Sequence, residues 1–122
     1  MLSKKNRLNK AEIEQIFKKS AFFASSYITL RYLIKNEQNK PKIAFITPKT
    51  TAKRAVKRNL LRRRGYFLCK KYINMLPGGF LGTFIFNKKS LEVFGGNKKK
   101  THNPIENMEK ELKAILQKAK LI

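Results

Sequence analysis

Residues 49–71, KTTAKRAVKRNLLRRRGYFLCKK, are the most distinctive stretch of the chain, and their charge decides how the rest is interpreted. The part between Lys53 and Arg64 carries seven Lys or Arg residues and no acidic residue. Like charges four residues apart destabilise a helix by roughly a few tenths of a kcal/mol per pair. A solvated helix face usually mixes both signs of charge, so this density favours a helix that binds a polyanion.

A helix with about 3.6 residues per turn sorts these side chains into three groups. One basic row contains Arg54, Arg58 and Arg62. A second basic row contains Lys53, Lys57 and Arg64. The third group is an apolar arc that we expect to lie on the core, and it contains Ala52, Ala55, Val56, Leu60 and Phe67. Two residues fit poorly: Arg63 projects into the apolar arc, and Leu61 lies between the basic rows.

The chain as a whole is also strongly basic. Its 122 residues include 29 Lys and Arg against 7 acidic residues, a net charge of +22, and no acid lies between Glu37 and Glu92. Such a surface repels itself unless a polyanion neutralises it. Nucleic acid is the first polyanion to expect, with an anionic membrane surface second. A hydrophobic content of 42% with nine Phe predicts one folded domain over residues 1–122.

Cysteine usage and apolar runs restrict the compartment. The single cysteine, Cys69, excludes an internal disulfide and is typical of a reducing compartment. No run approaches the roughly 18 apolar residues of a membrane span, and the N-terminus lacks the apolar core of a signal peptide. We therefore predict a cytoplasmic protein with no membrane partner.

Start and stop signals predict the helices. The first should begin after Asn9, with Glu12 completing a capping box, and run to about Lys19. The basic helix should continue past Gly65, a weak point, until the Pro-Gly-Gly stop at residues 77–79. After a loop over residues 88–101, a last helix should begin at Asn103.

The strand signals complete an α+β prediction. Aromatic and β-branched runs predict strands at 22–24, 27–33, 42–47 and 80–86. The strands at 27–33 and 42–47 look like a hairpin. Those at 43–47 and 83–86 are joined through the basic helix and should be parallel. The sequence therefore predicts helices laid on one mixed sheet.

Catalytic groups are scarce, whereas binding groups are abundant. His102 stands alone in a Lys-rich loop, Cys69 has no His within local reach, and the Gly pairs look like turns. Arg forks engage phosphates and stack on bases, and Lys adds point charge. Aromatic residues can stack bases if they are exposed, although core packing is the simpler interpretation of each; they are Phe17, Phe22, Phe23, Tyr27 and Tyr32.

Residues 48–63, PKTTAKRAVKRNLLRR, resemble the signature of the bacterial ribonuclease P protein subunit. That signature is a strand end and a Lys-rich loop, followed by a helix reading A-V-x-R-N-R-x-K-R-x-x-R. The residues that match are Ala55, Val56, Arg58, Asn59, Arg62 and Arg63. The chain departs from the signature where Leu60 replaces the second Arg of R-N-R, Tyr66 stands at the last Arg, and Thr50 stands at a usual loop Lys.

The resemblance implies a specific fold and activity. The fold would be a mixed four-stranded sheet with three helices in the order α-β-β-β-α-β-α, similar to the second domain of ribosomal protein S5, with a left-handed β-α-β crossover. The protein would be the small subunit of a ribonucleoprotein whose RNA carries the active site and its Mg²⁺ ions. It would assist removal of the 5′ leader from precursor tRNA. We then expect no catalytic residue, metal ligand or small-molecule ligand in the protein itself.

Site residues follow from the resemblance and from the helix wheel. Those expected to bind ribonuclease P RNA are Lys49, Lys53, Arg54, Lys57, Arg58, Asn59, Arg62, Arg63 and Arg64. Those expected to bind the leader of precursor tRNA are Ile13, Phe17, Tyr27 and Arg31, with Ile13 standing where the family has Phe. Arg54 and Arg64 are also candidates to replace the charge that is missing at Leu60.

Two alternatives remain open. The first is a basic ribosomal-type protein that binds RNA structurally and has no tRNA substrate. The second is a nuclease that uses Lys, His and Glu chemistry without RNA. The sequence leaves open whether Lys98–Lys100 contacts RNA.

Overall fold

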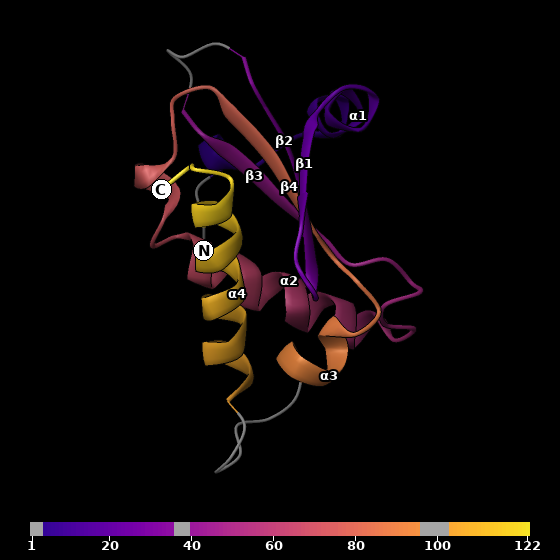
Figure 1. Ribbon diagram of the computed structural model, residues 1–122. Helices are drawn as coiled ribbons and strands as arrows, with labels where there is room; N and C mark the ends of the chain where they lie inside the picture. The colour runs from indigo at the N-terminus through magenta and orange to yellow at the C-terminus, as the bar shows by residue number, and fades with distance from the viewer. Residues whose placement is uncertain (1–3, 36–39, 96–102) are drawn as a thin grey trace.

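The computed structural model describes residues 4–35, 40–95 and 103–122, which form an α+β fold (Figure 1). The sheet consists of β1 (Ala21–Ala24), β2 (Ile28–Ile34), β3 (Lys42–Ile46) and β4 (Phe80–Phe86). The α-helices of this part are α1 (Lys10–Lys18), α2 (Ala55–Cys69), α3 (Ser90–Phe94) and α4 (Pro104–Lys118). Short 3₁₀ helices cover Lys4–Asn6 and Ile73–Met75.

The strand order corrects one prediction and confirms two. The order is β1-β2-β4-β3, so the predicted hairpin of residues 27–33 with 42–47 is wrong, because β2 pairs with β1 and β4. The parallel pairing of β3 with β4 is confirmed, as is the short strand at 22–24, which forms part of β1. The physical reason lies in β4, whose FLGTFIF run is almost entirely buried and suits a central strand that pairs on both edges.

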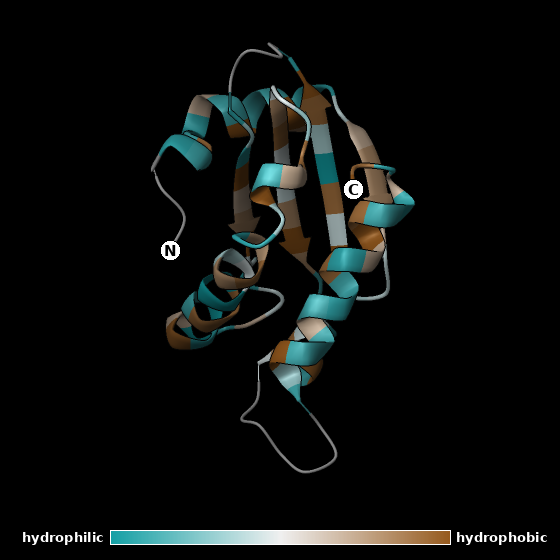
Figure 2. Ribbon diagram, turned by 90° about the vertical axis from the view of Figure 1, so that its left-hand side faces the viewer, coloured by the Kyte–Doolittle hydropathy of each residue, from teal (hydrophilic) through white to brown (hydrophobic). Residues whose placement is uncertain are grey.

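The core lies between one face of the sheet and the two long helices. Figure 1 shows α1 on one side of the sheet and α2 with α4 on the other. On the α2 side, Leu30, Phe84 and Phe45 lie in one row across three strands, and the Phe45 and Phe84 rings stack 4.9 Å apart. Figure 2 shows largely hydrophobic strands, whereas α4 alternates hydrophilic and hydrophobic residues. On the other face, Ile16 of α1 is fully buried.

The predicted caps are confirmed at both ends of the chain. The Glu12 backbone N–H donates to Asn9 Oδ1 at 2.9 Å, and the Asn9 N–H donates to Glu12 Oε1 at 3.0 Å, which is a complete capping box. Asn103 Oδ1 accepts from the N–H groups of Ile105 and Glu106, both at 3.1 Å, at the start of α4. These local signals were readable because capping depends on residues close in sequence.

The buried face of α2 differs from the predicted apolar arc. Its buried residues are Leu61, Gly65, Leu68 and Cys69, whereas Val56 is 69% exposed and Phe67 is 67% exposed. Ala52 is buried as expected, but it lies in the loop before the helix. Gly65 explains the orientation: a Cβ there would lie 2.6 Å from the Phe45 ring, so only Gly lets α2 approach β3 this closely.

The structure also divides two predicted segments differently. The α-helix α2 ends at Cys69, and the buried Tyr72, Ile73 and Leu76 follow in a turn and a 3₁₀ helix before Pro77. Within the predicted loop at 88–101, residues Ser90–Phe94 form α3, so the prediction of three helices is wrong by one short helix. Phe94 is its anchor, fully buried with its ring 6.2 Å from that of Phe86.

Candidate nucleic-acid interface

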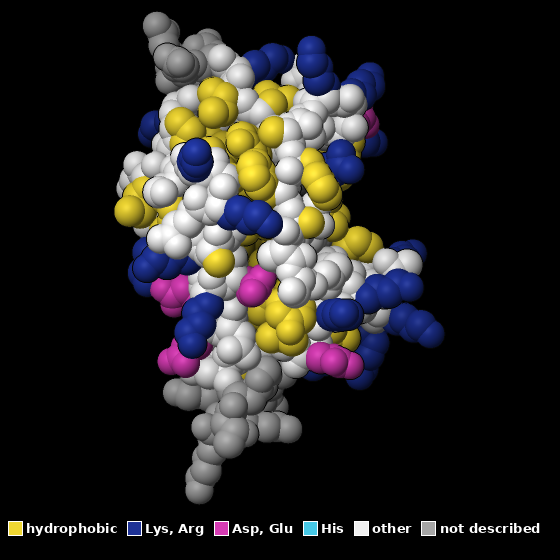
Figure 3. Space-filling view, in the orientation of Figure 1, with side chains coloured by type: hydrophobic (Ala, Val, Ile, Leu, Met, Phe, Trp, Pro, Cys, Tyr) yellow, Lys and Arg dark blue, Asp and Glu magenta, His cyan; other side chains and the backbone are white. Residues whose placement is uncertain are grey.

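The basic face comprises the loop 48–54 and the Lys and Arg side chains of α2. Figure 3 shows Lys and Arg gathered at the lower right, where Figure 1 places this loop. The loop is fixed from beneath, because the buried Thr51 hydroxyl donates to the Phe86 carbonyl of β4 at 2.7 Å. Lys49, Lys53 and Arg54 are exposed beside this anchor. The loop therefore presents cations from a defined backbone position.

Arg58 is part of the loop's own structure. Its Nη1 donates to the carbonyl of Ala52 at 3.0 Å and to that of Lys53 at 2.7 Å. Arg54, the residue before the helix, makes no side-chain cap. The three residues of this predicted row therefore have different environments. Arg54 is an exposed loop residue, and Arg58 joins the loop to the helix. Arg62 lies on the helix and donates to Asn59 Oδ1.

The second predicted row is also divided. Arg64 turns toward α3, where its Nη1 donates to the Phe94 carbonyl at 2.6 Å. Lys53 lies in the loop before the helix, and Lys57 lies in the first turn of α2. Burial, followed by the charge of neighbouring Arg63, lowers the pKa of Arg64 from its usual value. Arg63 itself is exposed. This bond uses only part of the Arg64 guanidinium and leaves its charge in place, so the hypothesis that Arg54 and Arg64 replace the charge missing at Leu60 stays a prediction.

Tyr66, which stands at one of the departures from the signature, contacts the edge strand of the sheet. The Phe45 N–H on the edge strand β3 donates to the Tyr66 hydroxyl at 3.2 Å, and the two rings meet edge to face at 5.1 Å. Sequence analysis missed this role because it depends on how α2 is rotated against β3.

A second cluster lies on the α1 side of the sheet. The Arg31 guanidinium of β2 stands over the ring of Phe17 from α1 at 5.7 Å and over the ring of Phe22 from β1 at 5.5 Å. Phe17 is 45% exposed and Phe22 is 56% exposed, so both rings remain accessible. These distances are within the range of cation–π attraction. We call Phe17, Phe22 and Arg31 the Arg31 cluster.

The structure brings together only part of the predicted leader site. Phe17 and Arg31 belong to the Arg31 cluster, and Ile13 is half-buried on α1. Tyr27 lies elsewhere, with its ring 5.4 Å from that of Phe94 on the α3 side of the molecule. Phe22 is the member that the leader prediction omitted. The pairing of Phe22 with Arg31 across β1 and β2 was hidden until the register was known.

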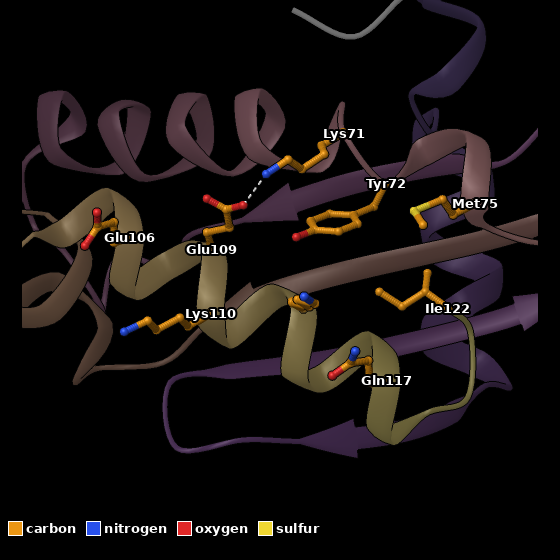
Figure 4. A pocket seen from close by; sticks show the side chains of 9 residues that line it. Lys71, Tyr72, Met75, Glu106, Glu109, Lys110, Gln117 and Ile122 are labelled. Carbon is orange, nitrogen blue, oxygen red and sulfur yellow. Dashed lines mark hydrogen bonds and ion pairs between the residues drawn. The ribbon is translucent and has the colours of Figure 1, made fainter.

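The Lys42–Glu12 and Lys71–Glu109 ion pairs lie outside these clusters. Lys42 of β3 contacts Glu12 of α1 at 3.0 Å. Burial raises the pKa of Glu12, but hydrogen bonds from Asn9 and Lys42 outweigh it and leave that pKa below its usual value. Lys71 pairs with Glu109, and this hydrogen bond raises the pKa of Lys71 (Figure 4).

The groove in Figure 4 lies between the end of α2 and α4 and has a volume of about 680 Å³. Its walls mix charges of both signs: Lys71 pairs with Glu109 beside the Tyr72 ring, and Glu106 and Lys110 lie further along α4. A mixed wall is a poor phosphate site because the carboxylates repel the anion. The groove is therefore distinct in character from the basic face.

Two features of the described residues bear on metal and thiol chemistry. Residues 4–35, 40–95 and 103–122 contain no group of three or more His, Cys, Asp and Glu placed to hold a metal ion. Burial raises the pKa of the Cys69 thiol, which is the opposite of what a nucleophile needs. In the same part of the chain, no helix is long and apolar enough to cross a membrane. His102 and Lys98–Lys100 lie outside the described residues.

Comparisons with known proteins match nearly the whole chain. The family model described as Ribonuclease P matches residues 2–120. The structure of the Staphylococcus aureus RNase P protein is similar with a TM-score of 0.76 and 16% identity, covering 95% of this chain and 96% of that one. The RNase P protein from Thermotoga maritima gives a TM-score of 0.72 and 21% identity, covering 91% and 96%.

A further Thermotoga maritima structure, in complex with 1-(4-fluorophenyl)-2-thiourea, gives a TM-score of 0.71 and 22% identity and covers 89% of this chain and 96% of that one. At these identities the structural likeness shows the fold. No curated protein matches the chain significantly in sequence.

Proposed function

Since the chain belongs to the ribonuclease P protein family, we propose that it is the ribonuclease P subunit that binds both the catalytic RNA and the 5′ leader of precursor tRNA. The observation that carries the proposal is the presence of two separate RNA-compatible surfaces on one domain. The basic face is acid-free, and the Arg31 cluster lies on the α1 side of the sheet. A protein that joins an RNA enzyme to its RNA substrate needs two such surfaces.

The basic face would bind the partner RNA through its phosphates. The exposed cations of the loop and the half-buried Lys57 of the first turn of α2 suit phosphate contacts, because each Lys or Arg that neutralises a phosphate releases a counterion. Asn59 is exposed on α2 and accepts from Arg62, which leaves its amide N–H groups to face a base edge or a ribose hydroxyl. This binding should weaken steeply with salt.

The Arg31 cluster would bind the leader. A single-stranded leader offers unstacked bases, and aromatic side chains stack such bases without strong sequence preference. Phe17 and Phe22 are accessible rings on two different elements, and Arg31 between them supplies a charge for the adjoining phosphate. Tolerance of sequence suits a subunit that must accept many different precursors.

Catalytic Mg²⁺ would belong to the RNA. When bound there, Mg²⁺ activates a water and stabilises the leaving oxygen at the scissile phosphate. The protein's contribution would be electrostatic: its cations reduce the repulsion between two RNAs, which should lower the Mg²⁺ concentration that the complex requires.

The test is cleavage of precursor tRNA by the cognate ribonuclease P RNA at low Mg²⁺, with and without the protein. The protein should stimulate cleavage. Changing both Lys53 and Lys57 to Ala should weaken binding of the catalytic RNA, whereas Arg31→Ala should weaken binding of precursors with long leaders and spare those with one-nucleotide leaders. Lys118→Ala, on α4, is the control. Failure to stimulate, with tight binding to ribosomal RNA instead, would contradict the proposal and favour a structural ribosomal-type role.

A further inference from the structure

The outer face of α2 exposes an apolar stripe on the most basic helix of the protein. Val56 and Phe67 are each about two-thirds exposed, and the half-buried Leu60 lies on the same arc. Apolar side chains that are exposed next to one another mark interaction sites more often than singly exposed ones do. This arc is the one expected on the core, and the rotation of α2 set by Gly65 turns it outward.

At one end the stripe meets α4 and becomes concave. Phe67 and the 40% exposed Ile105 face a hollow of about 250 Å³ that is also lined by Arg63 and Arg64. We call this the Phe67 hollow. Its apolar surface comes from one aromatic ring and one aliphatic side chain on different helices, and both charged members of its wall are cations.

We propose that the Phe67 hollow binds a single unstacked base of the partner RNA, with the base face on the Phe67 ring and Arg63 on the adjoining phosphate. This inference rests on the proposed function and adds a base-stacking contact to a helix whose other contacts are to phosphates. It concerns the catalytic RNA, because the leader surface lies on the α1 side of the sheet.

The charge of the hollow selects RNA over a protein occupant. Arg63 is exposed, and Arg64 is held at the wall by its 2.6 Å bond to the Phe94 carbonyl. An anion beside both residues relieves their mutual repulsion, which is one of the causes that lower the pKa of Arg64. A second copy of this chain would bring another +22 charge to a surface without acids on α2. An RNA nucleotide combines a flat apolar face with a phosphate, and the hollow offers a complement to each.

Leu60 also provides apolar surface where the family signature has a charged side chain. It replaces an Arg of the signature, and with Val56 and Phe67 it extends the apolar stripe along α2. Part of the RNA affinity should therefore be independent of salt, because stacking releases no counterions, in contrast to phosphate contacts.

The experiment compares Phe67→Ala, Phe67→Trp, Arg63→Ala and the control Met75→Ala in binding to the cognate ribonuclease P RNA over a salt series. Phe67→Ala should weaken binding about tenfold at every salt concentration, as the loss of one stacked base predicts. Phe67→Trp should retain binding, since it preserves an aromatic face. Arg63→Ala should lower the log–log salt slope by about one. Met75→Ala, which truncates a 61% exposed side chain outside both the apolar stripe and the hollow, should change little.

A photocrosslinker at position 67 supplies the direct readout, and it should label one unpaired nucleotide of the catalytic RNA. Unchanged affinity of Phe67→Ala, while changing Lys53 and Lys57 still impairs binding, would overturn the base pocket and leave the proposed function standing. If wild type does not bind the RNA at all, the proposed function fails first. A wild-type dimer that Phe67→Ala converts to monomer would also overturn the inference, by assigning the stripe to self-association.

Discussion

The basic face and the Arg31 cluster use arginine in opposite ways. On the basic face, Arg58 and Arg64 donate to backbone carbonyls of the loop and of α3, so part of the cationic sequence holds the structure that presents the rest. In the Arg31 cluster, one guanidinium is held only 5.5 and 5.7 Å from two accessible rings. A high density of Lys and Arg in the sequence therefore overstates the number of side chains that are free of contacts within the protein. In the Arg31 cluster, by contrast, a single Arg is placed between two accessible rings.

The two surfaces should also differ in how they respond to salt and sequence. Phosphate contacts are long-range and salt-dependent, whereas stacking on an aromatic ring is short-range and largely independent of salt. The basic face should thus dominate the rate at which RNA associates. The Arg31 cluster should dominate the rate at which a single-stranded RNA dissociates. The following changes separate the two surfaces.

Gly65→Val should have the largest effect, because it disturbs the packing of α2, the helix that presents the basic face, against the core. A Cβ at this position meets the Phe45 ring at 2.6 Å, and that ring is confined by Phe84 and Tyr66. Overpacking of this kind costs about 3 kcal/mol, which thermal unfolding would detect as a lower Tm. The exposed substitution Arg63→Ala is the control. An unchanged Tm would mean that α2 does not need its close approach to β3.

Arg58→Ala should cost less stability, about 2 kcal/mol, because two hydrogen bonds from a charged donor to the loop are lost. Arg62→Ala should leave stability nearly unchanged, since its bond to Asn59 is exposed. Both should weaken RNA binding. Urea unfolding of the two variants distinguishes Arg58, which holds the loop, from Arg62, which is available to contact RNA. Equal losses of stability would contradict that distinction.

The comparison also shows what the sequence could reveal. Local signals were reliable: the Asn9 and Asn103 caps and the positions of all four strands depend on neighbouring residues. The false hairpin and the rotation of α2 depend on distant contacts. Gly65 looked like a weak point in a helix, although its value lies in the absence of a side chain opposite Phe45.

The site was predictable to a similar extent. Charge without acids identified the basic face, but which cations remain available depended on backbone carbonyls at Ala52 and Phe94 that no pattern reveals. Strand alternation would have put Arg31 and Thr29 on one face of β2, but pairing Arg31 with Phe22 required the register. Tyr27 would lie on that same face by alternation, but it precedes the strand and its ring packs against Phe94 instead.

Arg31→Ala should reduce affinity for a single-stranded leader about tenfold, by removing both cation–π contacts and one phosphate partner. Its effect on affinity for the catalytic RNA should be within twofold, because the cluster is remote from α2. Arg31→Lys tests geometry, since Lys keeps the charge but lacks the flat guanidinium. Fluorescence anisotropy with labelled leader and labelled catalytic RNA measures the two affinities. Equal losses for both RNAs would show that the two surfaces are not independent.

Tyr66→Phe should have the smallest effect, about 1 kcal/mol, because it removes the hydroxyl that accepts from the Phe45 N–H and keeps the ring that packs edge to face. Tyr66→Arg restores the charge of the signature but gives up both contacts, so it should lose more stability than Tyr66→Phe. If Tyr66→Arg instead kept full stability and bound RNA more tightly, position 66 would belong to the basic face. Chemical unfolding and RNA binding, measured on the same samples, decide between the two roles of position 66. A residue that supports β3 changes the free energy of unfolding, whereas a residue that contacts phosphate changes the affinity for RNA.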